Sequence, residues 1–518
     1  MEIQLPHGVP SSSAGIVAAF ERLIDEYHER WCSQLVQSAA VFPQAEMAVR
    51  QLSTQVEGWL LVRLLAAPQV KDAIGRQGEL LRQERQMRQG NLVTRAVRLL
   101  CGMVVFIRCW YAAPSRSVRA GRPRKQGRRG KEGSGLYPEL AVLGIHEGIS
   151  LALRSEATRQ VVLLPSLEQA RKELERRGVS LGSKQLYRII HETGGFVQAQ
   201  RAAWVSAWRA GSLKMGSELA GKRVGVAVDG GRARIREHSP QGRKTKSGRR
   251  RYKTPWKEPK LLIIYVIDER GRMDPEFPPF IDGTMEGPDA LMELVAMHLH
   301  RLGASLAREG VFLGDGADWI WARVPWVKAK VGLITDSWHA VVDFYHVMEH
   351  VSVALDAEYA AQPTVKKRQR KILKTMLKRG QIDEVIRYLR QLRTPTQAAN
   401  EENNVAYFER RRLLLGYAKL LKRRLPIGSG AVESAIRRVI NQRLKAPGTF
   451  WNIESIEPML YMRAQALTSR WDEMMIQIQN IAAYERHRDI HIDPTPPCPK
   501  TGHSLLIPSN PVVQRAAA

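Results

Sequence analysis

Apolar side chains recur along this chain at intervals that change several times, and each interval predicts a kind of element. In residues 14–90 they recur every three or four positions, as at Phe20, Leu23, Ile24 and Tyr27. This is the spacing of one face of an amphipathic helix. We therefore predict that the chain opens with helices.

The following residues change from helical spacing to alternation. Residues 93–100 and 103–112 alternate on either side of Gly102, which predicts a β-hairpin. Together with the helices before it, the hairpin makes up a first region over residues 1–113. Residues 114–136 are rich in Gly, Arg and Ser and hold almost no apolar residue, so they are expected to form a linker.

Helical spacing returns in a third region, residues 137–215. One helix is expected over residues 167–177, followed by a turn over residues 178–182. Ser183 is the expected N-cap of a second helix, because a serine side chain can accept a hydrogen bond from the first turn.

The second helix of this pair has distinct inward and outward positions. Its inward positions are Leu186, Ile189 and Ile190, and its outward positions are Lys184, Gln185, Arg188 and His191. This pattern is typical of a helix-turn-helix, whose second helix reaches phosphates and base edges of DNA. An ordinary pair of packed helices would show the same pattern.

Residues 216–350 alternate strand-like runs with helices, which is typical of an α/β sheet. The expected strands are residues 224–229, 232–237, 261–267, 311–314 and 340–343, and a helix is expected over residues 288–308. The first two strands are close enough to form a hairpin.

The rest of the chain is expected to hold a helical insertion, a last helical region and a tail. Residues 351–425 have helical spacing and a basic composition, so they read as an all-helical insertion. Helix resumes over residues 426–485, which completes the α/β core. Residues 486–518 are rich in Pro and polar residues, and a disordered tail is expected there.

The length and charge of the chain limit what it can bind. A chain of 518 residues is expected to form several domains, because single cores rarely exceed about 250–300 residues. Lys and Arg number 80 against 51 Asp and Glu, a net charge of +29, which favours nucleic acid or an anionic membrane surface. The longest apolar runs are far shorter than the roughly 20 residues of a spanning helix. We therefore expect a DNA-binding protein without a membrane segment.

The start of the chain and its cysteines bear on its location. The first residues are polar and show no signal-peptide pattern. The four cysteines form no Cys-x-x-Cys pair, so neither a disulfide framework nor a structural zinc site is predicted. A reducing cytoplasm is the expected compartment.

Three carboxylates lie where a two-metal site would need them. Asp229 ends the apolar run 224–228, and Asp315 ends the run 311–314, each followed by glycine. Glu433 lies at the start of a helix rich in Arg. Two acids at strand ends and one on a helix can converge on a pair of Mg²⁺ ions about 3.5–4 Å apart. An aspartate before glycine is also a common turn after a strand, and it needs no metal.

Two residues near these carboxylates leave alternatives open. Asp318 could compete with Asp315 as a ligand, although it suits the start of a helix carrying Trp319 and Trp321. If Ser429 is an N-cap, Glu433 falls at the fourth helical position, one place too late for a capping box. Glu433 could instead form a surface ion pair with Arg437, four residues later.

Basic segments provide candidate DNA contacts. Residues 119–125, Arg-Ala-Gly-Arg-Pro-Arg-Lys, look like an AT-hook that lays Arg side chains into a narrow minor groove. A solvated basic linker is the alternative. Residues 243–253 are expected to touch backbone phosphates. The expected DNA-binding residues in these segments and near Glu433 are Arg122, Arg124, Lys125, Arg249, Arg250, Arg251, Arg437, Arg438, Arg443, Lys445 and Trp451.

Residues 346–350 fit the pattern His-x-x-Glu-His, in which two histidines one helical turn apart bind zinc and the glutamate acts as a base. A zinc peptidase is therefore one alternative function. The match is short, and no later residue supplies an obvious third ligand.

Several motifs, taken in order, resemble the DDE transposases of bacterial insertion sequences, most closely the ISKra family. They are Val-Asp-Gly-Gly-Arg (228–232), Trp-Lys-Glu-Pro-Lys (256–260), Gly-Asp-Gly-Ala-Asp-Trp-Ile-Trp (314–321), Val-Asp-Phe-Tyr-His-Val-Met-Glu-His (342–350), Gly-Ser-Gly-Ala-Val-Glu-Ser (428–434), and Asn-Gln-Arg-Leu-Lys (441–445) with Trp451. Each fragment is short, but they keep their order over a long stretch.

The resemblance implies a mixed-sheet, RNase H-like core with Asp229, Asp315 and Glu433 as a triad that binds two Mg²⁺ ions, or Mn²⁺ in their place. Asp343 and His346 fall on an Asp-x-x-His signature, so His346 joins the expected catalytic residues. Trp256 and Lys257 are further expected DNA contacts. Relatives often carry a Cys-containing segment after the hairpin, whereas here residues 110–115 lead into the Arg-rich linker.

The resulting hypothesis is a bacterial, nucleoid-associated transposase. It would bind the terminal inverted repeats of its element, cut the phosphodiester backbone and join the 3′ ends to target DNA. Such an enzyme is expected to act as a homodimer or a larger assembly on double-stranded DNA. A DNA-binding regulator that has kept the fold and lost the chemistry is the main non-enzyme alternative.

Overall fold

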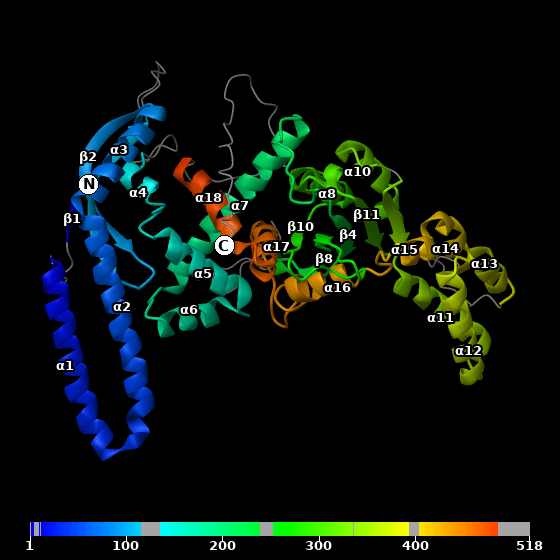
Figure 1. The fold of residues 1–518 in the computed structure, drawn as a ribbon, viewed down its shortest axis with the longest axis horizontal. Coiled ribbons are helices and arrows are strands. Elements are labelled where there is room, and N and C mark those ends of the chain that lie inside the picture. Colours follow the sequence, from blue (N-terminus) through cyan, green and yellow to red (C-terminus); the bar gives the residue numbers. More distant parts are fainter. Residues whose placement is uncertain are drawn as a thin grey trace.

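The computed structural model describes residues 2–4, 10, 12–114, 135–238, 252–334, 336–392 and 404–484. They form an elongated molecule in which an N-terminal helical hairpin and a late group of helices lie at opposite ends, with the main sheet between them (Figure 1). Within these ranges, no helix combines the length and the apolar character needed to cross a lipid bilayer. Residues 115–134, 239–251 and 485–518, which hold most of the predicted linker, basic segment and tail, lie outside the description.

Helices fill most of residues 14–90, as predicted, and the last of them ends at Glu84. They are α1 (Ser13–Gln37), α2 (Phe42–Ala66) and α3 (Pro68–Glu84), with a short 3-10 turn, η1 (Ala39–Val41), before α2. Ser12 caps α1 by accepting a hydrogen bond from Gly15 N at 3.0 Å. Exposed apolar side chains are numerous on α1 and α2, for example Val17, Phe20, Leu60 and Leu64.

The predicted hairpin is confirmed. Strands β2 (Met87–Arg98) and β3 (Val104–Pro114) pair antiparallel, and the short β1 (Glu2–Gln4) adds to the other side of β3. Gly102 lies in the turn with φ of +83°, a conformation that glycine adopts without strain. Strand β2 begins earlier than the alternation alone indicated.

The short helix α4 (Pro138–Val142) packs on α3 and β3, and a second helical unit follows, made of α5 (Leu151–Leu163), α6 (Leu167–Arg176) and α7 (Ser183–Arg209). Leu186 and Ile189 are buried in its core, whereas Lys184 and Arg188 are exposed, as the spacing predicted. The predicted cap is wrong by one residue: Gly182 is the N-cap, and Ser183 is the first residue of the helix.

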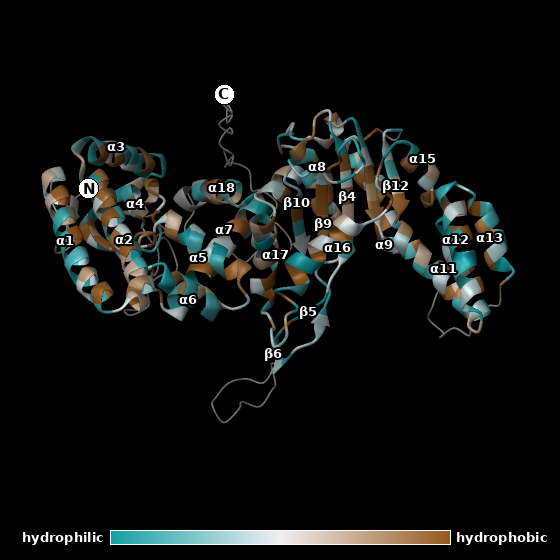
Figure 2. Ribbon diagram, turned by 60° about the horizontal axis from the view of Figure 1, so that its bottom comes forward, coloured by the Kyte–Doolittle hydropathy of each residue, from teal (hydrophilic) through white to brown (hydrophobic). Residues whose placement is uncertain are grey.

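The main sheet has five strands: β4 (Arg223–Gly230), β9 (Lys260–Val266), β10 (Phe280–Thr284), β11 (Glu309–Gly314) and β12 (Trp338–Val342). Their order is β10-β9-β4-β11-β12. Strand β9 is antiparallel to β4 and to β10, whereas β11 and β12 run parallel to β4. The fold is therefore mixed α/β, and Figure 2 shows that the strands of this sheet are its most continuous hydrophobic part.

Two sequence expectations for this region need correction. The spacing of apolar residues did not predict β10, because Asp282, a buried residue in the middle of this strand, is polar. The expected strand over residues 232–237 is broken into β5 (Ala233–Arg234) and β6 (Glu237–His238), which pair with β8 (Trp256–Lys257) and β7 (Tyr252–Lys253).

Helices flank the sheet on both sides. Helix α8 (Pro288–Leu302) packs on β9 and β10, and α16 (Gly430–Ile436) packs on β4 and β9 from the other side (Figures 1 and 2). Helix α8 ends earlier than expected because Gly303 adopts a φ of +79°, and a 3-10 turn, η2 (Ala304–Leu306), follows. The short helices α9 (Asp318–Trp321) and α10 (Val324–Val331) follow β11.

The late part of the chain is helical where it is described. It contains α11 (Phe344–Tyr359), α12 (Pro363–Lys378), α13 (Ile382–Arg390), α14 (Asn404–Arg410), the 3-10 turn η3 (Arg412–Leu414) and α15 (Tyr417–Lys422). After α16 come a π-helical turn (Arg437–Asn441), α17 (Ile453–Leu467) and α18 (Trp471–Tyr484). The helix expected throughout residues 433–485 is thus interrupted between the π-helical turn and α17.

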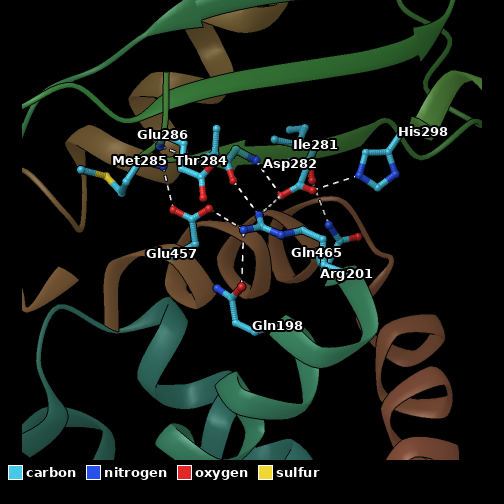
Figure 3. A network of polar contacts seen from close by, with 11 residues as sticks. Gln198, Arg201, Ile281, Asp282, Thr284, Met285, Glu286, His298, Glu457 and Gln465 are labelled. Carbon is cyan, nitrogen blue, oxygen red and sulfur yellow. Dashed lines mark hydrogen bonds and ion pairs between the residues drawn. The ribbon is translucent and has the colours of Figure 1, made fainter. Parts of the chain in front are cut away.

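A buried network of charged side chains joins α7 to the sheet (Figure 3). Arg201 on α7 donates a hydrogen bond to Asp282 Oδ1 at 3.2 Å and another to Gly283 O at 2.8 Å. Its other terminal nitrogen pairs with Glu457 on α17. His298 Nε2, on α8, lies 2.9 Å from Asp282 Oδ2. The network therefore fixes four elements against one another at one point.

Candidate active site

Three aspartates lie at the carboxyl ends of three neighbouring parallel strands. Asp315 directly follows β11 and Asp343 directly follows β12, while Asp229 is the penultimate residue of β4. The three strands pair in register, so these aspartates occupy matching positions along them. In open α/β sheets this edge is where ligands bind. The topology therefore gathers acids that are far apart in the sequence.

Glu433 is brought to the same region by α16. Ser429 is the N-cap of α16, so Glu433 occupies the fourth helical position. Ser429 donates from its backbone N and from Oγ to Asp343 Oδ2, and its Oγ lies 3.4 Å from Glu433 Oε1. In the described part of the chain no ion pair joins Glu433 to Arg437, in contrast to the alternative drawn from their spacing.

The electrostatics of Asp229 show that the carboxylates act on one another. Burial, together with the nearby carboxylates Asp315, Glu433 and Glu258, raises the pKa of Asp229 from 3.8 to about 6, although a hydrogen bond from Gly230 N opposes the shift. Like charges raise a carboxyl pKa only when they are close enough to repel its ionised form. A divalent cation would remove this repulsion.

The donor set of these residues fits a hard cation, although they do not form a closed ligand set. Carboxylate oxygens are the ligands that Mg²⁺ prefers. Asp229 Oδ1 accepts from Gly230 N at 2.6 Å and Asp315 Oδ1 from Ala317 N at 2.9 Å, and none of the described residues donates to either Oδ2. Within the described residues no three His, Cys, Asp or Glu side chains are grouped tightly enough to hold a metal ion as they stand.

The raised pKa of Asp229 predicts how stability depends on pH in the absence of divalent metal. Between about pH 4 and pH 6 the folded state keeps a proton that the unfolded state has lost, so this group makes stability fall as pH rises. Asp229→Asn should therefore stabilise the metal-free protein by about 1–2 kcal/mol at neutral pH and by little near pH 4. Chemical denaturation with EDTA at both pH values measures this, and an equal effect at both would contradict it.

Residues on and just after α14 contact the turn that carries Asp315. Arg411 donates from Nε to Gly316 O at 2.6 Å and pairs with Asp318 at 2.8 Å. A side chain at Gly316 would collide with Tyr407, because an added Cβ would lie 2.3 Å from Tyr407 Oη. Asp318 is the first residue of α9 and is engaged by Arg411, which favours its structural interpretation over a role as a ligand.

The two histidines of the His-x-x-Glu-His pattern both face Tyr407. The ring of His350 stacks on Tyr407 with centroids 3.7 Å apart, and His346 Nδ1 lies 3.3 Å from Glu349. The ring centroids of His346 and His350 are 5.2 Å apart. Glu349, the expected base of the peptidase alternative, thus pairs with His346, and the catalytic role of His346 stays a prediction.

Most expected DNA contacts that fall on described residues are accessible. Lys184, Arg188, Trp256, Lys257, Arg437 and Lys445 are exposed, and Gln185, Arg438 and Trp451 are half-buried. Trp256 lies beneath Arg234, whose guanidinium carbon is 4.8 Å from the ring centroid. Arg122, Arg124, Lys125, Arg249, Arg250 and Arg251 fall outside the described residues.

Arg443 differs from its expected place. Its residue is only 6% exposed, because the side chain turns inward and lies over Trp451, 4.9 Å from the ring centroid. Arg443 is therefore buried rather than exposed along its helix, and its role as a DNA contact stays a prediction. Spacing could not reveal this, since the residue follows the π-helical turn, which shifts the helical face.

Two further acids lie near the site, and the sequence did not predict the part that either plays in the structure. Glu258 acts on Asp229 and lies beside Gly230, where an added Cβ would meet its Oε1 at 2.1 Å. Asp343 was noted only through the resemblance; the structure shows that it caps α11 and holds Ser429, so it positions the turn that carries Glu433. An aspartate immediately before a predicted helix was the available signal for that capping role.

No known family model matches the chain, and no curated protein matches it. A solved structure that aligns with it is the Drosophila P element transposase strand transfer complex, with 12% identity over 64% of this chain and 82% of that chain. The TM-score is 0.24, which is too low to support a shared fold. What the fold and the site define is a mixed α/β protein with an acidic cluster at its sheet edge.

Proposed function

We propose that this chain is a DNA transposase of the DDE type, which cuts the phosphodiester backbone at the ends of its element and joins the 3′ ends to target DNA. The observation that carries the proposal is the register of β4, β11 and β12, which places Asp229 and Asp315 at matching positions at one edge of the sheet, with Glu433 brought to the same region by α16. Carboxylates held together at the edge of a sheet suit a site for divalent cations.

The sheet supports an RNase H-like core as the scaffold. The central strand, β4, pairs with the antiparallel β9 on one side, beyond which lies β10, and has the parallel strands β11 and β12 on the other side. Asp229 lies on that central strand and Asp315 on the next one. The helices between β12 and α16 then correspond to the insertion that separates the last acid from the first two.

Each residue of the triad has a distinct role in the proposal. Asp229, Asp315 and Glu433 would together hold two Mg²⁺ ions. Bound there, the ions would supply activation of a water or a DNA 3′-hydroxyl and stabilisation of the departing oxygen. Asp343 and Ser429 keep Glu433 in place, and Asp229 must lose its proton before it can bind a cation.

DNA binding is assigned to basic, exposed side chains outside the carboxylate cluster. The net charge of +29 favours a polyanion, and the outward face of α7 offers Lys184, Gln185 and Arg188. The proposed partners are the terminal inverted repeats and target DNA, bound by a homodimer or larger assembly. Salt-dependent contacts with phosphates would supply much of the affinity.

Replacing Lys184 and Arg188 by glutamine should weaken binding to DNA ends. Each lost phosphate contact is expected to reduce the slope of log affinity against log salt by about one. Fluorescence polarisation with labelled duplexes over a range of salt measures the slope. Lys172→Gln, on α6, removes a cation that is not assigned to DNA binding and serves as the matched control. An unchanged slope in the double variant would contradict this role for α7.

The function itself is tested with purified protein and linear DNA that carries both element ends. Nicking and strand transfer that depend on Mg²⁺ or Mn²⁺ are the expected result. Tight end binding without any cleavage would instead identify a DNA-binding regulator. Hydrolysis of casein that is lost in His346→Ala would identify the peptidase, a function that the ring stack of His350 on Tyr407 does not favour.

A further inference from the structure

A cavity of about 630 Å³ lies between α7 and the segment that leads into α17. Its wall includes Tyr187 and His191 from the outward face of α7, and Phe450 and Trp451 from the opposite segment. The volume is within the range of small-molecule sites, about 300–1,000 Å³. Four aromatic or heteroaromatic rings around one cavity suit a flat, unsaturated ligand.

Arg443 also lines this cavity, and it is a buried cation without an anion. It is 6% exposed, and its Nε has no hydrogen-bond partner. Within the described residues the Arg443 side chain makes no hydrogen bond or ion pair, and its guanidinium instead lies over the Trp451 ring. Burial lowers the pKa of Arg443, which is the sign of an uncompensated charge. Such a group favours binding of an anion.

Arg236 brings a second cation to the same wall. Its guanidinium carbon lies 4.5 Å from the ring centroid of Tyr252 and 4.8 Å from that of Phe450, and its Nε is likewise without a partner. A hydrogen bond of 2.7 Å from Arg236 N to Trp451 O ties the two sides of this wall together. Aromatic rings interleaved with arginines are the surface on which unpaired bases and their phosphates bind.

Acidic residues in the lining do not cancel these charges. Glu457 is already paired with Arg201 and accepts a hydrogen bond from Met285 N at 2.7 Å. Glu286 and Glu454 are exposed, and no ion pair of either with Arg443 or Arg236 is recorded among the described residues. An anion that reaches Arg443 must also fit between the rings, so a lone phosphate would leave most of the apolar wall uncovered.

We propose that this cavity holds one unstacked nucleotide of a DNA strand, with the base against the aromatic wall and the phosphate on Arg443 and Arg236. The proposal rests on the proposed function only in taking DNA as the source of the nucleotide. Arg236, which lies between β5 and β6, follows Asp229 closely in the chain. An unpaired nucleotide held here would fix the path of a DNA end relative to the carboxylates.

The test compares binding of a duplex with a short single-stranded overhang and of the same duplex with a blunt end. Both are measured by fluorescence polarisation in EDTA, so that no cleavage enters the result. Wild type should prefer the overhang by about tenfold, the size expected for one stacked base. Arg443→Met should remove most of that preference, and Arg443→Lys should restore part of it.

Thermal unfolding separates binding from a structural role. Because Arg443 is buried without an anion, Arg443→Met should keep or raise the melting temperature. Arg308→Met, an exposed arginine outside the cavity whose ion pair with Glu269 spans 3.4 Å, is the matched control and should keep the overhang preference. A fall in melting temperature with an unchanged preference would overturn the proposal.

Free deoxynucleoside monophosphate distinguishes the source of the nucleotide. Competition by this probe for the overhang, lost in Arg443→Met, supports the pocket. Binding of the monophosphate without any overhang preference would show a site for free nucleotides and overturn its assignment to DNA. Since none of these measurements needs catalysis, a failed cleavage assay would leave their outcome intact.

Discussion

Asp229→Asn, Asp315→Asn and Glu433→Gln are each expected to abolish metal-dependent cleavage of element ends while leaving end binding intact. Each substitution removes a charged oxygen ligand and keeps the shape of the side chain. Metal ions contribute several kcal/mol to the transition state in such sites, so a loss of about a thousandfold in rate is expected. Nicking of a labelled linear substrate in Mg²⁺ and in Mn²⁺ measures it.

Asp318→Asn is the matched control for the triad. Asp318 lies close to Asp315 in the sequence but is engaged by Arg411 at 2.8 Å, so its loss should leave cleavage within about tenfold of wild type. Full nicking by any triad variant would contradict the assignment. Inactivity of Asp318→Asn with an intact fold would instead show that a different pair of acids binds the cation.

Arg201→Met should be the most destabilising of the substitutions considered for this protein. It leaves the carboxylates of Asp282 and Glu457 buried without their cation, and breaking a buried pair in this way costs about 3–5 kcal/mol. The midpoint of chemical denaturation measures the loss. Arg209→Met, on the same helix but 44% exposed and paired with Glu293, should cost less than about 1 kcal/mol. Equal effects of the two substitutions would refute the importance of the buried network.

The same network predicts sensitivity to acid. Burial lowers the pKa of His298 to about 4, even though Asp282 opposes the shift. The unfolded histidine takes up a proton near its ordinary pKa of 6.5, so the stability that this group provides is lost as pH falls from about 6.5 towards 4. Although burial alone would raise the pKa of Asp282, Arg201 and His298 lower it, which adds a further loss at still lower pH. The raised pKa of Asp229 makes stability change with pH in the opposite direction, which distinguishes its contribution from that of the network.

The buried network around Arg201 and the cavity beside Arg443 share helix α7. The network around Arg201 joins α7 to the sheet, and the cavity that contains Arg443 lies along the same helix. DNA held on the outward face of α7 would therefore be held on an element fixed rigidly to the scaffold of the carboxylates. A site that must place one phosphodiester against two ions needs such rigidity.

The sequence by itself determined the helices and strands in which apolar residues recur at a regular interval. Four of the five main strands, the hairpin, the helical pair and the helical late region could be placed because burial imposes a regular spacing on apolar residues. The strand it missed, β10, carries Asp282 at a buried position, where the apolar pattern is broken by a charge that Arg201 and His298 compensate. The sequence also singled out Asp229, Asp315 and Glu433, through strand ends, a helix start and the resemblance between motifs.

Only the tertiary structure decided which of these residues lie near one another in space. Register between parallel strands places Asp229, Asp315 and Asp343 side by side, and the packing of α16 adds Glu433, whereas spacing along the chain carries no such information. The inward turn of Arg443 and the cavity beside it depend on a π-helical turn and on contacts with α7. Both arise from long-range packing, which fixes side-chain direction after local propensity has fixed the element.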